Sequence, residues 1–134
     1  MLFRSRILLI EPDRVLAANI REYLENRLHH KVQWRADAQA SINSSEESPP
    51  DVVVLELQLG MHSGVEFLYE FRSYPDWQHV PIVVLSTVPE AEIGSSTILW
   101  KELEIIAYYY KPETTLEHIG QAIEEALRVS RRRY

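Results

Sequence analysis

The sequence predicts one α/β domain in which a doubly wound, five-stranded parallel sheet is covered by helices on both faces. Two observations predict this fold: apolar runs of strand length recur along the chain, and helical patterns separate them. Most of the runs are continuous and rich in Val, Ile and Leu, which is typical of parallel strands buried on both faces. At 134 residues the chain has the length of one domain. Five strands and five helices therefore form three α/β/α layers.

The expected strands differ in how apolar they are. The main runs cover residues 7–10, 51–57, 82–85 and 105–110. A less apolar run, 32–35, is expected at an edge of the sheet. Side chains alternate along a strand, so Tyr108 and Tyr109 should face opposite sides of the sheet.

The expected helices vary in amphipathic character. They cover residues 12–28, 36–42, 65–71, 91–102 and 116–129. Pro12 suits the first turn of a helix. The helix 36–42 is poor, and the polar stretch 43–50 after it reads as a loop. Gly94, Ser95 and Ser96 weaken the helix 91–102, whereas 116–129 has one clear apolar face.

Composition and charge exclude several classes of function. The chain has no cysteine, which excludes disulfides, thiolate metal sites and cysteine nucleophiles and fits a reducing compartment. A net charge of −6 argues against general binding to nucleic acid. No apolar stretch approaches the ~20 residues that span a bilayer, and the N-terminus lacks the features of a signal peptide. We therefore expect a cytoplasmic protein that binds neither nucleic acid nor membrane.

Polar side chains follow the expected strands where each strand ends. They are Glu11, Asp13, Glu56, Ser86 with Thr87, and Lys111 with Pro112. In an open parallel sheet, functional groups gather outside the carboxyl ends of the strands. Carboxylates can hold a magnesium ion, while a hydroxyl and an ammonium can bind phosphate oxygens. This set points to the handling of a phosphoryl group.

Four segments in register resemble the receiver domains of bacterial two-component response regulators. They are residues 7–11, 50–57, 81–86 and 108–112. Gly64, eight residues after Glu56, also matches a family glycine. The resemblance runs from about residue 5 to residue 128. It implies one receiver-like domain over residues 1–134, with the flavodoxin-like strand order 2-1-3-4-5.

The resemblance assigns a role to each matching position. Glu56 corresponds to the phosphate-accepting aspartate of the family. Ser86 corresponds to the conserved hydroxyl, Lys111 to the phosphate-contacting lysine and Tyr108 to the aromatic switch residue. Pro112 would follow a cis peptide bond, which only an X–Pro bond adopts cheaply.

Two departures from the family pattern concern the acidic residues. Receivers carry two adjacent acidic residues after the first strand, whereas Glu11 is followed by Pro12, and Asp13 comes one position late. Glu56 is one methylene longer than aspartate, and a misplacement of that size can cost ~100-fold in rate. We expect no ordinary phosphorylation, no cofactor, and weak or absent magnesium binding. Glu11, Asp13 and Glu56 come nearest to a metal-ligand set.

Three interpretations of Glu56 stay open. Its longer side chain could place a permanent negative charge near Lys111 and Ser86 and so favour one conformation. It could instead form an inert structural pair with Lys111. Genuine phosphorylation on Glu56 or Asp13 is the third.

The function expected from these features is signalling by an atypical (pseudo-)receiver that is not an enzyme. Its partners would be signalling proteins such as a histidine kinase or an output protein, and a homodimer could form through residues 91–102, Tyr108 and residues 116–129. One alternative is a phosphorylation-competent single-domain response regulator. Another is an unrelated enzyme on the same fold, but residues 11–14 supply no phosphate-binding loop for a flavin or dinucleotide.

Histidine and tryptophan side chains add no further site. We expect His29, His30 and His62 to face solvent, because no spacing suits a metal-binding histidine pair. Trp77 and Trp100 are expected to pack in or against the core.

Overall fold

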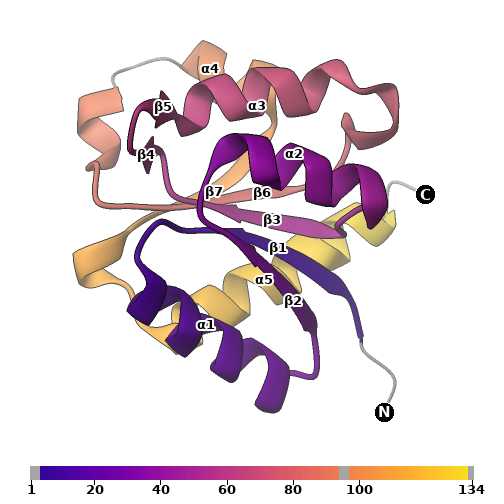
Figure 1. Cartoon of the computed structure of the whole chain (residues 1–134), viewed down its shortest axis with the longest axis vertical. Helices are drawn as coiled ribbons and strands as arrows, with labels where there is room; N and C mark the ends of the chain where they lie inside the picture. Colours follow the sequence, from indigo (N-terminus) through magenta and orange to yellow (C-terminus); the bar gives the residue numbers. More distant parts are fainter. Residues whose placement is uncertain (1–3, 94–96, 133–134) are drawn as a thin grey trace.

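The computed structural model describes residues 4–93 and 97–132, and its main feature is a five-stranded parallel sheet (Figure 1). The strands are β1 (Arg6–Ile10), β2 (Lys31–Arg35), β3 (Val52–Leu55), β6 (Ile82–Ser86) and β7 (Ile105–Tyr110). They are arranged β2-β1-β3-β6-β7, which confirms the order 2-1-3-4-5 once the parallel strands are counted along the chain. The sequence analysis did not predict β4 (Gln58–Leu59) and β5 (His62–Ser63), which form a separate antiparallel pair.

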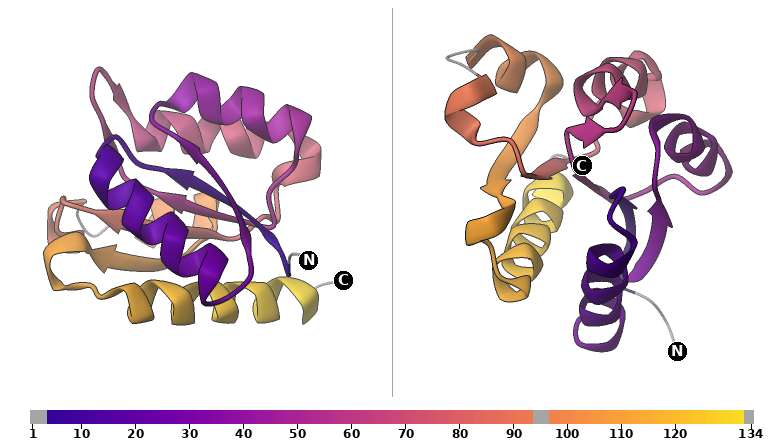
Figure 2. Two further views of the ribbon diagram at one scale, coloured as in Figure 1. Left: turned by 60° about the horizontal axis from the view of Figure 1, so that its bottom comes forward. Right: turned by 60° about the vertical axis from the view of Figure 1, so that its left-hand side comes forward.

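Five α-helices in the described part of the chain cover the two faces of the sheet (Figure 2). The helices α1 (Arg14–Asn26) and α5 (Leu116–Arg132) lie on one face. The helices α2 (Ala38–Glu47), α3 (Gly64–Ser73) and α4 (Thr97–Leu103) lie on the other. Short 3-10 turns are η1 (Pro75–Trp77), η2 (Glu90–Ile93) and η3 (Lys111–Glu113). The expected three-layer α/β/α architecture is confirmed.

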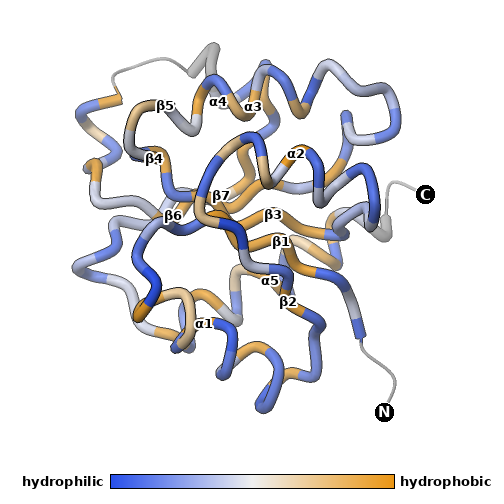
Figure 3. Tube along the Cα trace, in the orientation of Figure 1, coloured by the Kyte–Doolittle hydropathy of each residue, from blue (hydrophilic) through white to orange (hydrophobic). Residues whose placement is uncertain are grey.

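The hydrophobic core consists of two clusters separated by the sheet. Ile7 and Leu9 of β1 contribute to the cluster under α1 and α5, whereas Leu8 and Ile10 contribute to the cluster under α2 and α3. Both faces of the central strands are therefore apolar, which explains their continuous apolar runs (Figure 3). Tyr109 packs against the first cluster and Tyr108 against the second, as their alternation predicts.

The start of α1 differs from the expectation. The helix begins at Arg14, and Asp13 is its N-cap, so Pro12 precedes the helix instead of lying in its first turn. Asp13 Oδ1 accepts hydrogen bonds from the N–H groups of Val15 at 3.0 Å and Leu16 at 3.1 Å. A capping carboxylate satisfies helix N–H groups that have no partner within the helix, and this fixes where α1 starts.

The helix α2 is longer than expected, because residues 43–47 are helical and not a loop. Ser41 Oγ donates to the Asp37 carbonyl at 2.6 Å, and Ser45 Oγ donates to the Ser41 carbonyl at 2.8 Å. These bonds to the preceding turn let buried serine hydroxyls lie in a helix without an unsatisfied polar group. Serine-rich composition alone suggested a loop.

The environment of His30 also differs from the expectation. His30 is fully buried, and its Nε2 lies 3.1 Å from Glu124 Oε1 of α5. His29 is exposed, as expected, and has a φ of 60°. The side chain of His62 lies outside the described residues.

The remaining expectations concern α4 and the tryptophans. Residues 91–102 include most of η2 and α4, and residues 94–96 between them lie outside the described residues. Trp77 is buried and Trp100 is half-buried, which confirms their packing roles. Among the described residues, no helix is long and apolar enough to cross a membrane.

Candidate functional site

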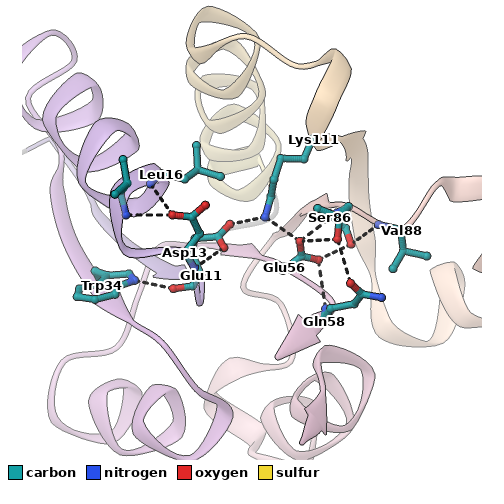
Figure 4. Close-up of polar contacts among 11 residues, drawn as sticks. Glu11, Asp13, Leu16, Trp34, Glu56, Gln58, Ser86, Val88 and Lys111 are labelled. Atoms are coloured by element: carbon teal, nitrogen blue, oxygen red, sulfur yellow. Dashed lines mark hydrogen bonds and ion pairs between the residues drawn. The ribbon is translucent and has the colours of Figure 1, made fainter. Parts of the chain in front are cut away.

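The carboxyl ends of the parallel strands bring Glu11, Glu56, Ser86 and Lys111 into one cluster (Figure 4). Glu11 and Glu56 directly follow β1 and β3 and extend the sheet by one backbone hydrogen bond each. The Glu11 N–H donates to the Arg35 carbonyl, and the Glu56 N–H donates to the Ile10 carbonyl, both at 3.0 Å. Both glutamates lie in the interior of the protein, where Glu11 is only 2% exposed and Glu56 only 3% exposed.

Lys111 joins the two carboxylates. Its Nζ lies 2.6 Å from Glu11 Oε1 and 2.7 Å from Glu56 Oε1. The other oxygen of Glu11, Oε2, accepts the Asp13 N–H at 2.9 Å. A single ammonium group therefore contacts one oxygen of each of two buried carboxyl groups.

Glu56 has further hydrogen bonds to two loops. Its Oε1 accepts the Thr87 N–H at 3.0 Å, in addition to the Lys111 ammonium. Its Oε2 accepts the Gln58 N–H at 3.1 Å and a short hydrogen bond from the Ser86 hydroxyl. Both oxygens of the Glu56 carboxylate thus already have at least two donors.

These contacts set the protonation states of the ion pair. Burial alone would raise the pKa of Glu56, but the hydrogen bonds from Lys111, Ser86 and the two amides outweigh it and hold that pKa below its usual value. Burial alone would lower the pKa of Lys111, but its bonds to Glu11 and Glu56 raise it instead. Glu56 and Lys111 are therefore both charged at neutral pH.

A chain of hydrogen bonds leads from Glu56 to Tyr108. Ser86 Oγ accepts the Val88 N–H at 3.0 Å, and the Tyr108 hydroxyl donates to the Val88 carbonyl at 2.5 Å. Burial raises the pKa of Tyr108, so its hydroxyl stays protonated and can donate. The Tyr108 ring lies against Trp100 of α4, with ring centroids 5.7 Å apart. The carboxylate is thereby connected to the surface formed by α4 and β7.

Gly64 fixes the approach of α3 to Glu56. Its N–H donates to the Leu57 carbonyl at 2.7 Å. A Cβ atom at this position would lie 2.8 Å from Leu57 Cα and 2.9 Å from the Glu56 carbonyl oxygen, both backbone atoms. Only glycine fits this close backbone approach, which accounts for the glycine singled out eight residues after Glu56.

Two residues expected at the site, Asp13 and Pro112, do not contribute their side chains to the cluster. Asp13 contributes its backbone N–H to Glu11, while its carboxylate caps α1. The expected cis bond before Pro112 is wrong, because the described residues contain no cis peptide. Pro112 instead lies in the 3-10 turn η3, closed by the Thr114 N–H donating to the Lys111 carbonyl at 3.2 Å, and a trans proline fits the start of such a turn.

The acidic residues do not fit a magnesium ion as they are arranged. Magnesium requires near-octahedral oxygen ligands. In residues 4–93 and 97–132, no three acidic or histidine side chains converge as a metal site would need. Glu11 and Glu56 are bonded to the Lys111 ammonium, whose positive charge repels a second cation.

Comparison with known proteins identifies the family. The family model of the response regulator receiver domain matches residues 7–123. The chain belongs to this family. Over 89 residues the receiver is 30% identical to the response regulator Rcp1 of Synechocystis, covering 60% of each chain. Over 90 residues it is 25% identical to the sensor histidine kinase TmoS of Ectopseudomonas mendocina, covering 67% of this chain and 9% of the kinase. It thus spans less than two thirds of either relative.

The fold comparison agrees with the family assignment. A CheY-like receiver domain protein from Methanospirillum hungatei superposes on this receiver with a TM-score of 0.84. The two are 17% identical, and the match covers 97% of this chain and 98% of the other. Receiver domains are signalling modules that work with histidine kinases and output domains in two-component systems. The chain is therefore a two-component signalling module, as the sequence indicated.

Sequence reasoning missed two contributors to the site. The backbone amides of Gln58 and Thr87 donate to Glu56, and no side-chain pattern signals a backbone donor. The sequence pattern distinguishes Thr87 only by its place beside Ser86 after the fourth strand. The sharing of Lys111 by Glu11 and Glu56 was also missed, although all three residues were expected at one edge of the sheet.

Proposed function

We propose that this receiver domain signals without being phosphorylated, as an atypical (pseudo-)receiver whose conformation is held by Glu56. Its output is contact with other signalling proteins. The observation that carries the proposal is the set of partners of the Glu56 carboxylate, which are the Lys111 ammonium, the Ser86 hydroxyl and the amides of Gln58 and Thr87.

The bonding of Glu56 argues against its acting as a phosphate acceptor. A carboxylate that attacks a phosphoryl group needs a free oxygen in line with the leaving group. Both Glu56 oxygens accept hydrogen bonds, and the side chain is 3% exposed. Attack would require breaking these bonds and opening the site.

The same bonding favours a conformational role over an inert ion pair. Ser86 and Thr87 both bind Glu56, and Val88 connects Ser86 to Tyr108. The permanent charge of Glu56 thus supplies to Lys111, Ser86 and the following loop the contacts that a phosphoryl group would otherwise supply. Because these contacts can form only in the conformation that brings Ser86 and Thr87 to Glu56, they stabilise that conformation over others.

The surface proposed for protein contacts is formed by α4, β7 and α5. Trp100 and Tyr108 lie half-buried there, at the end of the hydrogen-bond chain from Glu56. Half-buried aromatic side chains are common anchors of protein interfaces. A histidine kinase, an output protein or a second copy of this chain would bind this surface.

The test is exposure of the purified protein to a small-molecule phosphodonor with magnesium, followed by intact-mass spectrometry. We expect the mass to stay unchanged. A Glu56→Gln variant, analysed in parallel by amide NMR, should shift the signals of Ser86, Val88 and Tyr108. A phosphorylated wild-type protein would contradict the proposal, and an unchanged spectrum of Glu56→Gln would show that Glu56 is inert.

A further inference from the structure

Two buried carboxylates face a single ammonium at the centre of the site. Glu11 Oε1 and Glu56 Oε1 lie 2.6 Å and 2.7 Å from Lys111 Nζ, and both glutamates are at most 3% exposed. The side chain of Lys111 is itself only 16% exposed. The ammonium thus lies between two acidic groups and out of contact with most of the solvent.

Two carboxylates this close together require a positive charge between them. Two carboxylates that approach one point repel each other, and burial strengthens the repulsion because water screens it less. If no positive charge lay between them, one carboxylate would take up a proton or an external cation. The Ser86 hydroxyl and the amides of Gln58 and Thr87 donate to Glu56 independently of Lys111, so three donors would still hold this carboxylate beside Glu11.

We propose that the Lys111 ammonium is the resident cation of this site and excludes divalent metal ions from it. Removing that positive charge would convert Glu11 and Glu56 into ligands for a divalent cation such as magnesium. The inference deepens the proposed function and rests on it in one respect, namely that the site operates without a phosphoryl group.

The fold holds the ammonium in this position. Lys111 follows β7 directly and begins the turn η3, which the Thr114 N–H closes on the Lys111 carbonyl at 3.2 Å. Glu11 is fixed by its hydrogen bond from the Asp13 N–H, and Glu56 by the donors already described. The two carboxylates would therefore stay close together when the ammonium is replaced.

The experiment compares metal binding by the wild type and by Lys111→Met, which keeps most of the side-chain length and removes the charge. Thermal unfolding is followed in metal-free buffer and with increasing magnesium or calcium. We expect metal to raise the midpoint of Lys111→Met and to bind it at least about tenfold more tightly than the wild type.

Matched variants locate the binding. Lys111→Arg keeps the charge and should respond like the wild type. Lys111→Met with Glu11→Gln removes one proposed ligand and should lose the gain. Lys101→Met removes an exposed lysine of α4 and should gain nothing. Equal metal responses of the wild type and Lys111→Met would overturn the proposal.

A second measurement keeps the proposal testable if Lys111→Met does not fold in metal-free buffer. Folding of that variant on addition of magnesium or calcium would support the proposal. If it stays unfolded, paramagnetic manganese is titrated into the wild type and amide NMR signals are followed. Selective broadening at Glu11, Gln58 and Thr87 would overturn the proposal, and its absence would support it.

The two proposals fail separately. Metal binding by Lys111→Met is measured without any phosphodonor, so its outcome does not depend on phosphorylation. Phosphorylation of the wild type would overturn the proposed function whatever Lys111→Met binds.

Discussion

Lys111 Nζ lies 2.7 Å from Glu56 Oε1, and this contact ties the end of β7 to the end of β3 across 55 residues of chain. Because Glu56 also binds Ser86 and the Thr87 amide, the contact links three strand ends through one carboxylate. Glu56, which the resemblance matches to the phosphate-accepting aspartate, is therefore part of a network of one ion pair and several hydrogen bonds.

Replacing Lys111 with Met in metal-free buffer should destabilise the protein by about 3–5 kcal/mol, the range for breaking a buried ion pair by removing one partner. The reason is that Glu11 and Glu56 would share a buried site without a counter-charge. Urea unfolding followed by circular dichroism measures the change. Lys101→Met is the control, and a loss no larger than that of this exposed residue would show that the pair contributes nothing.

The stability supplied by the ion pair should depend on pH in a defined window. The pKa of Glu56 is lowered in the folded state. Its contribution to stability is therefore fully present at pH values above about 4.3, the usual pKa of glutamate, and is lost as the pH falls through the lower pKa of the folded state. The pKa of Lys111 is raised in the folded state. Its contribution to stability is therefore fully present at pH values below about 10.4, the usual pKa of lysine, and is lost as the pH rises through the higher pKa of the folded state.

This dependence is measured as the difference in unfolding free energy between the wild type and Glu56→Gln over a pH series. The difference should be largest and flat between those two values and should shrink below about 4.3. A difference that stays constant from neutral to strongly acidic pH would mean that the Glu56 charge does not stabilise the fold.

Replacing Gly64 with Ala should destabilise the protein by about 1–3 kcal/mol, as overpacking does. The new Cβ would collide with Leu57 Cα and the Glu56 carbonyl oxygen, neither of which is a flexible side-chain end. Gly120→Ala is the control, because its Cβ would meet side-chain atoms of Leu28 and Tyr23, and alanine favours the helix α5. Equal thermal midpoints for the two variants would show that the α3 approach is not constrained.

Replacing Tyr108 with Phe should cost about 1 kcal/mol, because the Val88 carbonyl loses its hydrogen bond. Amide NMR should show changes at Val88 and along α4. Tyr110→Phe is the matched control, since the Tyr110 hydroxyl makes no hydrogen bond to any described residue. If the amide spectrum changes at Tyr108 alone, the loop after β6 is not coupled to this residue.

The variant Glu56→Asp combined with Pro12→Asp should gain magnesium-dependent phosphorylation by a small phosphodonor. The shorter aspartate side chain would release part of the present bonding, and a second acidic residue would stand beside Glu11. Intact-mass spectrometry detects the product. Glu56→Asp alone should be phosphorylated less, and an inert double variant would mean that the pocket differs from an active receiver in further ways.

Much of the fold was predictable because burial on both faces of a sheet leaves a distinct pattern. The strand order was implied by the resemblance to receiver domains. The apolar runs of β1, β3, β6 and β7 predicted a parallel sheet and placed Glu11, Glu56, Ser86 and Lys111 at one edge. The alternation of Tyr108 and Tyr109 across β7 was predictable for the same reason. These features depend on local periodicity, which a single sequence contains.

Features that depend on distant partners were not predictable. His30 is buried, and its ring nitrogen Nε2 forms a hydrogen bond with the carboxylate of Glu124, which is 94 residues away in the sequence. Residues 43–47 are helical although their composition suggests a loop, and within them Ser44 Oγ donates to Gln33 Oε1 of the neighbouring strand β2. Lys111 was expected near Glu56, but its equal contact with Glu11 depends on side-chain geometry and not on spacing.

In the function proposed above, Glu56, and no phosphoryl group, sets the conformation of this receiver. The most direct measurement is amide NMR of the wild type with magnesium and beryllofluoride, a mimic of a phosphorylated carboxylate. We expect no shifts at Glu11, Glu56 or Ser86. Shifts in that pocket that extend to Tyr108 and α5 would show a working phosphorylation switch and would rule out signalling by Glu56 alone.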